Sequence, residues 1–192
     1  MLVLGIESTC DETAAAVVKN GHEILSNIIA SQDDIHNQYG GVFPELAARR
    51  HLEAIIPVID EALKKANVTK DDIDLIAVAN KPGLVGSILI GLNTAKALSM
   101  AWDKPYVGIN HIEAHLYASM MGVDMEKISF PSLGVVISGG HTLLLKIDKI
   151  GQYEKISSTI DDAIGEAFDK VASILGLPYP GGPHVEKLAK IK

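Results

Sequence analysis

The feature that most constrains the fold of this chain is a unit of three short apolar runs followed by a helix, which occurs twice. In the first copy the runs cover residues 2–6, 14–18 and 23–29, and Asn20-Gly21 separates the second run from the third. Asn-Gly between apolar runs is a strong hairpin signal. The first copy therefore begins as a three-stranded antiparallel meander.

The second copy occupies residues 131–192 and repeats the spacing of the first. Gly134 and Gly151 are 17 positions apart, and Gly5 and Gly21 are 16 apart. Each copy has a polar turn between its first two strands and a helix after its third, which indicates duplication of a whole fold unit rather than two unrelated meanders. The first copy continues with further strands and helices, so we expect a complete domain at 1–130 and an incomplete one at 131–192.

The segment between the two meanders alternates helical and extended patterns. Apolar residues recur at spacings of three and four from Leu52 to Leu63, which predicts a helix with a kink or a fresh turn at Pro57. The sequence predicts strands at 75–79 and 106–109 and helices at 87–100, from His111 and at 161–175, the last opened by Asp161-Asp162. This order indicates a mixed α/β layer architecture.

Composition excludes several classes of protein. The net charge of −7 over 192 residues argues against binding nucleic acid by bulk charge, and Arg49-Arg50-His51 is a compact basic cluster. The single cysteine, Cys10, cannot form an internal disulfide, which fits a reducing compartment. The apolar start lacks a basic segment, and the later apolar run 84–92 is about half as long as a membrane span. We therefore expect a cytoplasmic protein that has no membrane span.

Two polar turns occupy equivalent places in the two copies, at residues 8–13 and 138–142. Small hydroxyl residues and glycines between strands expose backbone N–H groups that can hold phosphate. One such turn is more often only a turn. The pair in a duplicated fold favours a nucleotide site.

The most specific local signal is the sequence His111-Ile112-Glu113-Ala114-His115. Histidines at i and i+4 lie on one helix face and can share a metal ion, although a solvated pair is the simpler alternative. In zinc peptidases of the His-Glu-x-x-His type, the general-base Glu directly follows the first His. Glu113 is two residues on, about 200° around the helix, so a peptidase would lack its base. Two histidines are also too few ligands for a tight site.

Six motifs in this order resemble the TsaD/Kae1/Gcp family, once described as O-sialoglycoprotein endopeptidases and now understood as tRNA adenosine threonylcarbamoyltransferases. The motifs are Gly5-Ile6-Glu7-Ser8-Thr9-Cys10-Asp11-Glu12-Thr13, Tyr39-Gly40-Gly41-Val42-Phe43-Pro44-Glu45, His111-Ile112-Glu113-Ala114-His115, Ser138-Gly139-Gly140-His141-Thr142, Gly165-Glu166-Ala167-Phe168-Asp169-Lys170 and Tyr179-Pro180-Gly181-Gly182-Pro183. The resemblance covers the whole chain. It implies a duplicated actin-like fold (ASKHA, related to ribonuclease H), with the first half complete and the second truncated.

The resemblance implies a transferase. The reaction would move the threonylcarbamoyl group from threonylcarbamoyl-adenylate to N6 of the adenosine beside the tRNA anticodon, forming t6A. The resemblance assigns the residues as follows: Fe²⁺ or Zn²⁺ on His111 and His115; Asp11 and Glu12 at the reacting centre; Val136, Ile137, Ser138, Gly139 and Gly140 at the adenylate; Asp169 at its ribose; and Gly182 near the base.

The chain departs from the family pattern at three places. Lys81 precedes Pro-Gly where the family commonly has Gly, and Ala48 stands where it often has Ser. Family members run well past 300 residues, and their C-terminal part supplies a third metal ligand, an Asp, that is absent from this chain. We therefore expect weak metal binding and little activity from these residues alone.

The expected partners are tRNA, threonylcarbamoyl-adenylate or ATP, a paralogous actin-like subunit, a small P-loop ATPase subunit and, as one option, a second copy in a homodimer. Two alternative functions stay open: a metallopeptidase, and a non-catalytic module for subunit association.

Overall fold

The computed structural model describes residues 1–39, 41–121, 123 and 127–190, which fall into two compact units. Unit 1 comprises Met1–Gln32 and Val42–Ala114, and unit 2 comprises Asp33–Gly41 and His115–Lys192. Gly40, part of the second motif, lies outside the described residues. The division of the chain into repeats at residue 130 stays a prediction, because compactness and sequence repetition are different criteria.

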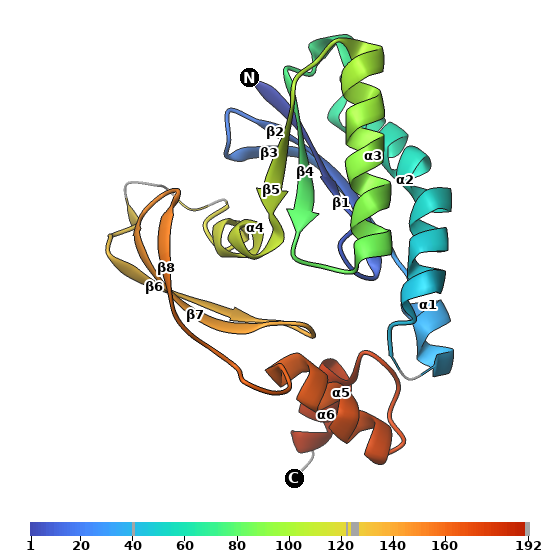
Figure 1. Ribbon diagram of the computed structural model, residues 1–192, viewed down its shortest axis with the longest axis vertical. Coiled ribbons are helices and arrows are strands. Elements are labelled where there is room, and N and C mark those ends of the chain that lie inside the picture. The colour runs from blue at the N-terminus through green and yellow to red at the C-terminus, as the bar shows by residue number, and fades with distance from the viewer. Residues whose placement is uncertain (40, 122, 124–126, 191–192) are drawn as a thin grey trace. The chain divides into compact units, whose positions relative to one another are not determined.

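Unit 1 is built on a five-stranded sheet with the order β3-β2-β1-β4-β5 (Figure 1). The strands are β1 Leu2–Glu7, β2 Glu12–Lys19, β3 Glu23–Ser31, β4 Leu75–Lys81 and β5 Tyr106–Asn110. The first three pair antiparallel, which confirms the predicted meander, whereas β4 pairs parallel with both β1 and β5. Asn20 (φ 52°) and Gly21 (φ 79°) both have left-handed backbones, as a two-residue hairpin turn requires.

Two long helices cover one face of this sheet, α2 (Pro44–Ala66) and α3 (Val85–Trp102) (Figure 1). The helix α2 includes Pro57 within its span, so the helix is not divided at that proline, and the predicted kink stays a prediction. The core between helices and sheet is aliphatic: Leu4, Ile6, Ala15, Val17, Ile55, Val58, Ile59, Ala62, Ile73, Ile76, Val78 and Ala95. No helix in the described part of the chain is both long enough and apolar enough to cross a bilayer.

The parallel pairing decides where functional groups gather in unit 1. Because β1, β4 and β5 run in the same direction, their carboxyl ends share one edge of the sheet. Glu7 ends β1, Lys81 ends β4 and Asn110 ends β5, and α4 (His111–Ala118) begins directly after Asn110. The first polar turn and the His-x-x-x-His helix therefore meet at this edge.

Unit 2 contains a second meander, with the order β6-β7-β8 and antiparallel pairing throughout. The elements are β6 Ser132–Ile137, β7 Thr142–Lys149, β8 Gln152–Ser158, α5 Ile164–Ile174 and α6 Gly181–Ala189. The pairing of the second strand with the third has one register shift in the first copy, at Val17/Val18, and two in the second, at Leu144/Leu145 and Ile147/Lys149. The three-stranded meander predicted for the second copy is therefore confirmed.

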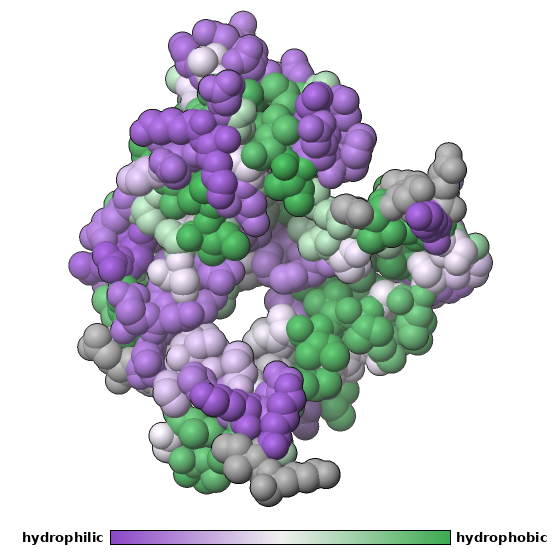
Figure 2. All heavy atoms as spheres, turned by 180° about the vertical axis from the view of Figure 1, so that it is seen from behind, coloured by the Kyte–Doolittle hydropathy of each residue, from purple (hydrophilic) through white to green (hydrophobic). Residues whose placement is uncertain are grey.

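The strand β6 carries apolar side chains on both faces. Val136 is buried, and a Cβ on Gly134 would lie 2.6 Å from Leu116 of α4, so this face is closely packed. On the other face Leu133, Val135 and Ile137 are exposed. Figure 2 shows hydrophobic side chains gathered over this sheet.

The start of α5 differs from the expectation. Asp161 and Asp162 lie before the helix, which begins at Ile164 with Ala163 at its N-cap. Asp162 Oδ2 instead accepts a hydrogen bond from Lys170 Nζ at 2.7 Å. Thr142 Oγ1 accepts a hydrogen bond from Ile164 N at 2.9 Å, so a hydroxyl from β7 satisfies the first helical amide.

Three short helical segments have no counterpart in the sequence-based expectation. They are α1 (Asp33–His36), η1 (Asn37–Tyr39) and η2 (Lys70–Asp72). The segment η2 is held by a capping box in which Asp72 Oδ2 accepts from both the amide and the hydroxyl of Thr69, each at 2.8 Å.

Candidate functional site

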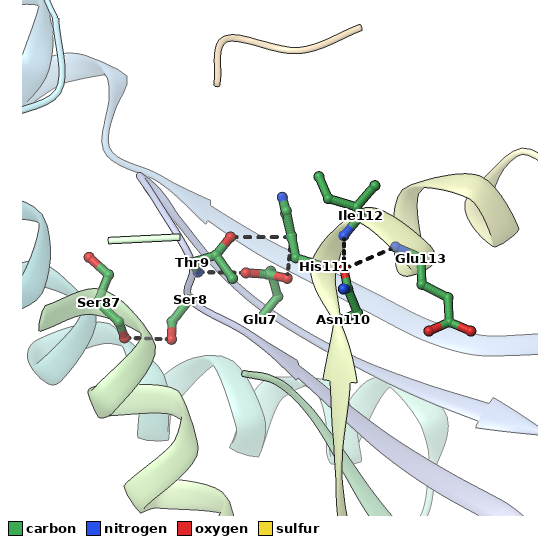
Figure 3. A network of polar contacts seen from close by, with 8 residues as sticks. All are labelled: Glu7, Ser8, Thr9, Ser87, Asn110, His111, Ile112 and Glu113. Atoms are coloured by element: carbon green, nitrogen blue, oxygen red, sulfur yellow. Dashed lines mark hydrogen bonds and ion pairs between the residues drawn. The ribbon is translucent and has the colours of Figure 1, made fainter. Parts of the chain in front are cut away.

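An acid–histidine pair lies at the carboxyl edge of the sheet in unit 1. Glu7 Oε2 lies 3.0 Å from His111 Nδ1, and Thr9 Oγ1 lies 3.2 Å from the same nitrogen (Figure 3). An ionised carboxylate can only accept, so the Glu7 contact places a proton on Nδ1. In the neutral ring this makes Nε2 the nitrogen with a lone pair, which is the form that ligates metals.

The Glu7 carboxyl is suited to stay ionised beside this ring. Burial raises its pKa, but hydrogen bonds from His111 and Thr9 outweigh burial and bring the pKa below its ordinary value. The carboxylate therefore persists at neutral pH and holds the orientation of His111. Sequence reasoning missed this role of Glu7. The sequence signal for this role was that Glu7, an acid, ends a strand, and that the histidine motif begins at the carboxyl end of another strand of the same sheet.

Asn110 fixes where α4 begins. Its Oδ1 accepts hydrogen bonds from Ile112 N at 2.9 Å and from Glu113 N at 3.4 Å, which satisfies amides that a helix N-terminus leaves open (Figure 3). The Glu113 carboxylate points away from the His111 ring in the same view. This agrees with the argument from spacing that Glu113 is not the general base of a metallopeptidase.

The two histidines of the motif lie one turn apart on α4, as predicted. A carboxylate that holds one ring nitrogen while the other faces a metal is a common arrangement around metal-binding histidines, and Glu7 provides it for His111. No group of three or more His, Cys, Asp or Glu residues that could hold a metal occurs among the described residues. The residues present therefore fit two ligands of a metal site.

The first polar turn is anchored to the start of α3. The buried Ser8 donates its hydroxyl to Ser87 O at 2.8 Å and accepts from Gly91 N at 3.1 Å. Thr9 O accepts from Leu84 N at 2.8 Å. A Cβ on Gly83 would lie 2.6 Å from Thr9 O, so only glycine permits this approach. These contacts therefore fix the turn at Ser8 and Thr9, just ahead in sequence of Asp11 and Glu12, the two residues predicted to lie at the reacting centre.

Asp11 is half-buried and Glu12 is exposed, so both are accessible in unit 1. Their neighbour Cys10 is exposed as a residue, although the surrounding protein partly desolvates its thiol. Burial and then the Asp11 carboxylate raise the pKa of the Cys10 thiol to about 12. Because the thiolate is the reactive form, Cys10 is a weak nucleophile at neutral pH.

The second polar turn, in unit 2, closes on itself and on α5. Ser138 N donates to His141 O at 2.8 Å, and His141 N donates to Ser138 Oγ at 3.0 Å. A Cβ on Gly165 would lie 2.6 Å from the Ser138 carbonyl, so α5 packs so close to this turn that only glycine fits at position 165. Gly139 and Gly140 have no atom within 4 Å of an added Cβ, and the space beside them is open.

The remaining predicted residues of the substrate site also lie in unit 2. The side chain of Val136 faces the core and that of Ile137 is exposed. Asp169 Oδ1 accepts from Gly181 N at 2.7 Å, which ties α5 to the start of α6, and the space beside Gly182 is open. Asp169 also lines a hollow together with Asn37, Ser173, Leu177 and Tyr179.

The structure thus groups the predicted residues by unit. Asp11 and Glu12 belong to the same unit as His111, whereas the predicted adenylate and ribose residues belong to unit 2. Within each unit, a polar turn between the first two strands is held by the helix that approaches it.

Known proteins resemble the chain in sequence and in fold. The family model TsaD, described as tRNA N6-adenosine threonylcarbamoyltransferase, matches residues 23–192. The chain is 66% identical over 190 residues to the tRNA N6-adenosine threonylcarbamoyltransferase of Protochlamydia amoebophila (strain UWE25), covering 99% of the chain and 55% of the relative. The enzyme of that name from Bacillus subtilis (strain 168) is 57% identical, and the match covers 99% of the chain and 54% of the relative. The chain spans about half the length of these relatives.

Two solved structures resemble the chain in fold. One is YeaZ from Pseudomonas aeruginosa, with a TM-score of 0.52 and 12% sequence identity; the match covers 83% of this chain and 68% of that chain. The other is the ethanolamine utilization protein EutJ from Carboxydothermus hydrogenoformans, with a TM-score of 0.55 and 15% sequence identity; the match covers 97% of this chain and 61% of that chain. Both have the actin-like ATPase fold, which confirms the expected fold class. At these identities the likeness concerns the fold alone.

Proposed function

The chain belongs to the tRNA N6-adenosine threonylcarbamoyltransferase family, and on this premise we propose that the protein carrying these residues transfers a threonylcarbamoyl group to N6 of the adenosine beside the tRNA anticodon. The observation that carries the proposal is the contact between Glu7 and His111, 3.0 Å apart, which joins the first polar turn to the His-x-x-x-His helix. Two motifs that are distant in sequence thereby form one site.

We propose that His111 and His115 hold a Fe²⁺ or Zn²⁺ ion, with further ligands from outside this chain. The bound ion would supply a Lewis acid that polarises the carbamoyl carbonyl. Glu7 keeps the proton of His111 on Nδ1 and fixes the plane of the ring, and Thr9 supports the same nitrogen. His111 is thus held in the tautomer that a metal ligand needs.

The donor in this proposal is threonylcarbamoyl-adenylate, or ATP from which it is made. The backbone N–H groups of Gly139 and Gly140 would contact the adenylate, Asp169 its ribose, and the open space beside Gly182 would accept the base. In the transfer a bond forms between N6 and the carbamoyl carbon, the bond from that carbon to the phosphate oxygen breaks, AMP leaves, and N6 loses a proton. Asp11 and Glu12 would face this centre.

The acceptor adenosine lies in a single-stranded loop, where a base can be splayed out without melting a duplex. The basic cluster does not provide a strong phosphate site, because Arg49 pairs with Glu45 at 2.7 Å and Arg50 with Glu53 at 3.0 Å on the same exposed helix face. We therefore infer that tRNA capture depends on partners, namely the paralogous actin-like subunit and the small P-loop ATPase subunit. The reaction would take place in the cytoplasm, and a homodimer remains an alternative assembly.

The experiment follows label from threonylcarbamoyl-adenylate into tRNA, using the full protein that contains this chain together with its partner subunits. His111→Ala and His115→Ala are expected to abolish transfer, whereas His22→Ala, on the exposed β2–β3 turn, should leave it unchanged. Absence of transfer by the unmodified protein would refute the proposed function. Full transfer by both motif variants would refute the metal assignment alone. Cleavage of a peptide substrate by the metal-loaded protein would instead favour the metallopeptidase.

A further inference from the structure

A buried histidine of α2 lies beneath the turn that carries Asp11 and Glu12. His51 is 0% exposed, although it follows two arginines in a cluster that resembles a solvated face. Its Nε2 lies 3.0 Å from Cys10 O, and its Nδ1 lies 2.8 Å from Thr13 Oγ1. The ring therefore contacts the residue just before Asp11 and the residue just after Glu12.

The partners of this ring determine its tautomer. A carbonyl oxygen only accepts, so the contact with Cys10 O places the proton of the neutral ring on Nε2. Nδ1 then accepts from the Thr13 hydroxyl, and the Gln32 side-chain amide also approaches it at 3.4 Å. Thr13 (0%) and Gln32 (3%) are buried as well, so each of these polar groups is satisfied inside the fold.

The contact is well placed to control the two carboxylates. Ser8 and Cys10 tie the turn to α3, and the Cys10 carbonyl accepts a longer hydrogen bond of 3.4 Å from Ser87 Oγ. Beyond Cys10 the chain enters β2, whose Glu12 pairs with the last residue of the edge strand β3. The rigid ring of His51 contacts Cys10 and Thr13, the residues on either side of the Asp11-Glu12 segment.

We propose that His51 is a positioning residue for the transfer reaction: as the neutral Nε2–H tautomer it holds both ends of the Asp11-Glu12 segment. Its importance for the reaction rests on the proposed function, which places Asp11 and Glu12 at the reacting centre. The holding contact itself does not depend on that function. The two parts can therefore be tested separately.

Two amide substitutions separate the two hydrogen bonds of the ring. In His51→Gln, the side-chain nitrogen reaches the position of Nε2 and can still donate to Cys10 O. In His51→Asn, the side-chain oxygen reaches only the position of Nδ1, so it can accept from Thr13 but cannot contact Cys10. Both variants lose the buried ring, and both should lose comparable stability. A purely structural role would affect them equally.

Alkylation of Cys10 reports the holding contact in this chain, because Cys10 is its single cysteine. The raised pKa of the thiol keeps reaction with N-ethylmaleimide slow at pH 7.5. We expect His51→Asn to speed alkylation by about tenfold or more, because a released turn moves the thiol away from the Asp11 carboxylate and into water. His51→Gln should stay within about threefold of the unmodified chain, because its donor hydrogen bond to Cys10 O is retained.

Transfer activity of the full protein with its partners reports the consequence for the reaction. His51→Asn is expected to lower kcat by about tenfold with KM for both substrates nearly unchanged, and His51→Gln should restore most of that loss. Equal alkylation rates in the two variants, or equal kcat values, would overturn the positioning role. Absence of transfer by the unmodified protein, with the alkylation difference intact, would count against the proposed function and not against the contact.

The tautomer gives a check that needs no substitution. A long-range ¹H–¹⁵N spectrum of the unmodified chain should show a protonated Nε2 and an unprotonated Nδ1 for His51. The opposite tautomer would overturn the proposal even if His51→Asn did not fold.

Discussion

Replacing Gly91 by Ala tests how the first polar turn is held against α3. A Cβ at this position would lie 2.5 Å from Ser8 Oγ, whereas its next contacts, Ser8 Cβ at 3.5 Å and Val78 Cγ2 at 3.6 Å, are ordinary. The hydroxyl that would be displaced is buried and bonded to Ser87 O and to Gly91 N. The clash is therefore with a single oxygen atom that the turn needs.

The expected cost follows from three contributions. Overpacking a filled site costs about 1–3 kcal/mol, and weakening two buried hydrogen bonds costs about 1 kcal/mol each. Replacing a helical glycine by alanine returns about 1 kcal/mol. We therefore expect Gly91→Ala to lower the free energy of unfolding by about 2–4 kcal/mol. In a Ser8→Ala background the oxygen is absent, and the same change should cost less than about 0.5 kcal/mol or stabilise the chain.

The assay is urea unfolding followed by the fluorescence of Trp102, the single tryptophan, which lies at the end of α3 and packs against the core of unit 1. Gly86→Ala is the matched control, because it adds a methyl group to the same helix and its Cβ would meet only Ala48 Cβ at 3.3 Å. The tight contact offsets part of the about 1 kcal/mol that a helical glycine-to-alanine change returns, so we expect this control to change stability by less than about 1 kcal/mol and not to depend on the Ser8 hydroxyl. An equal cost of Gly91→Ala with and without the Ser8 hydroxyl would refute the reasoning.

Two further predictions concern other parts of the chain. Hydrogen bonds from the Thr69 amide and hydroxyl lower the pKa of Asp72, so its carboxylate stabilises the fold above the ordinary pKa of about 3.9 and loses this effect as pH falls through the lowered value. Thermal midpoints should therefore be higher for the unmodified chain than for Asp72→Asn at pH 7, and the difference should shrink as the pH falls through the lowered pKa; a constant difference would contradict this. In unit 2, Gly165→Ala should speed amide hydrogen exchange at residues 138–141, because its Cβ would lie 2.6 Å from the Ser138 carbonyl. Gly182→Ala, which meets no atom within 4 Å, should leave that exchange unchanged.

The elements of the fold could be predicted where the signal is local. The Asn20-Gly21 turn requires left-handed backbones at two adjacent residues, and the structure has them. The helix that begins at His111 was also predictable, and its cap is the residue directly before it. The prediction for Asp161 and Asp162 was wrong because Lys170, eight residues beyond Asp162, pairs with that carboxylate, while Thr142 of β7 satisfies the first helical amide.

The candidate site depends on contacts that no local pattern specifies. Spacing identified His111 and His115 as a pair on one helix face, but Glu7 is 104 positions from His111 and meets it only because parallel strands bring their carboxyl ends to one edge. His51 belongs to a charged run, and only the packing of α2 against the sheet shows that it is buried under Cys10 and Thr13. Residue types and spacings thus decide strands, helices and turns, because those depend on neighbours within a few positions. Which side chains share a proton or hold a turn depends on how the strands and helices pack, and that is decided by the tertiary structure.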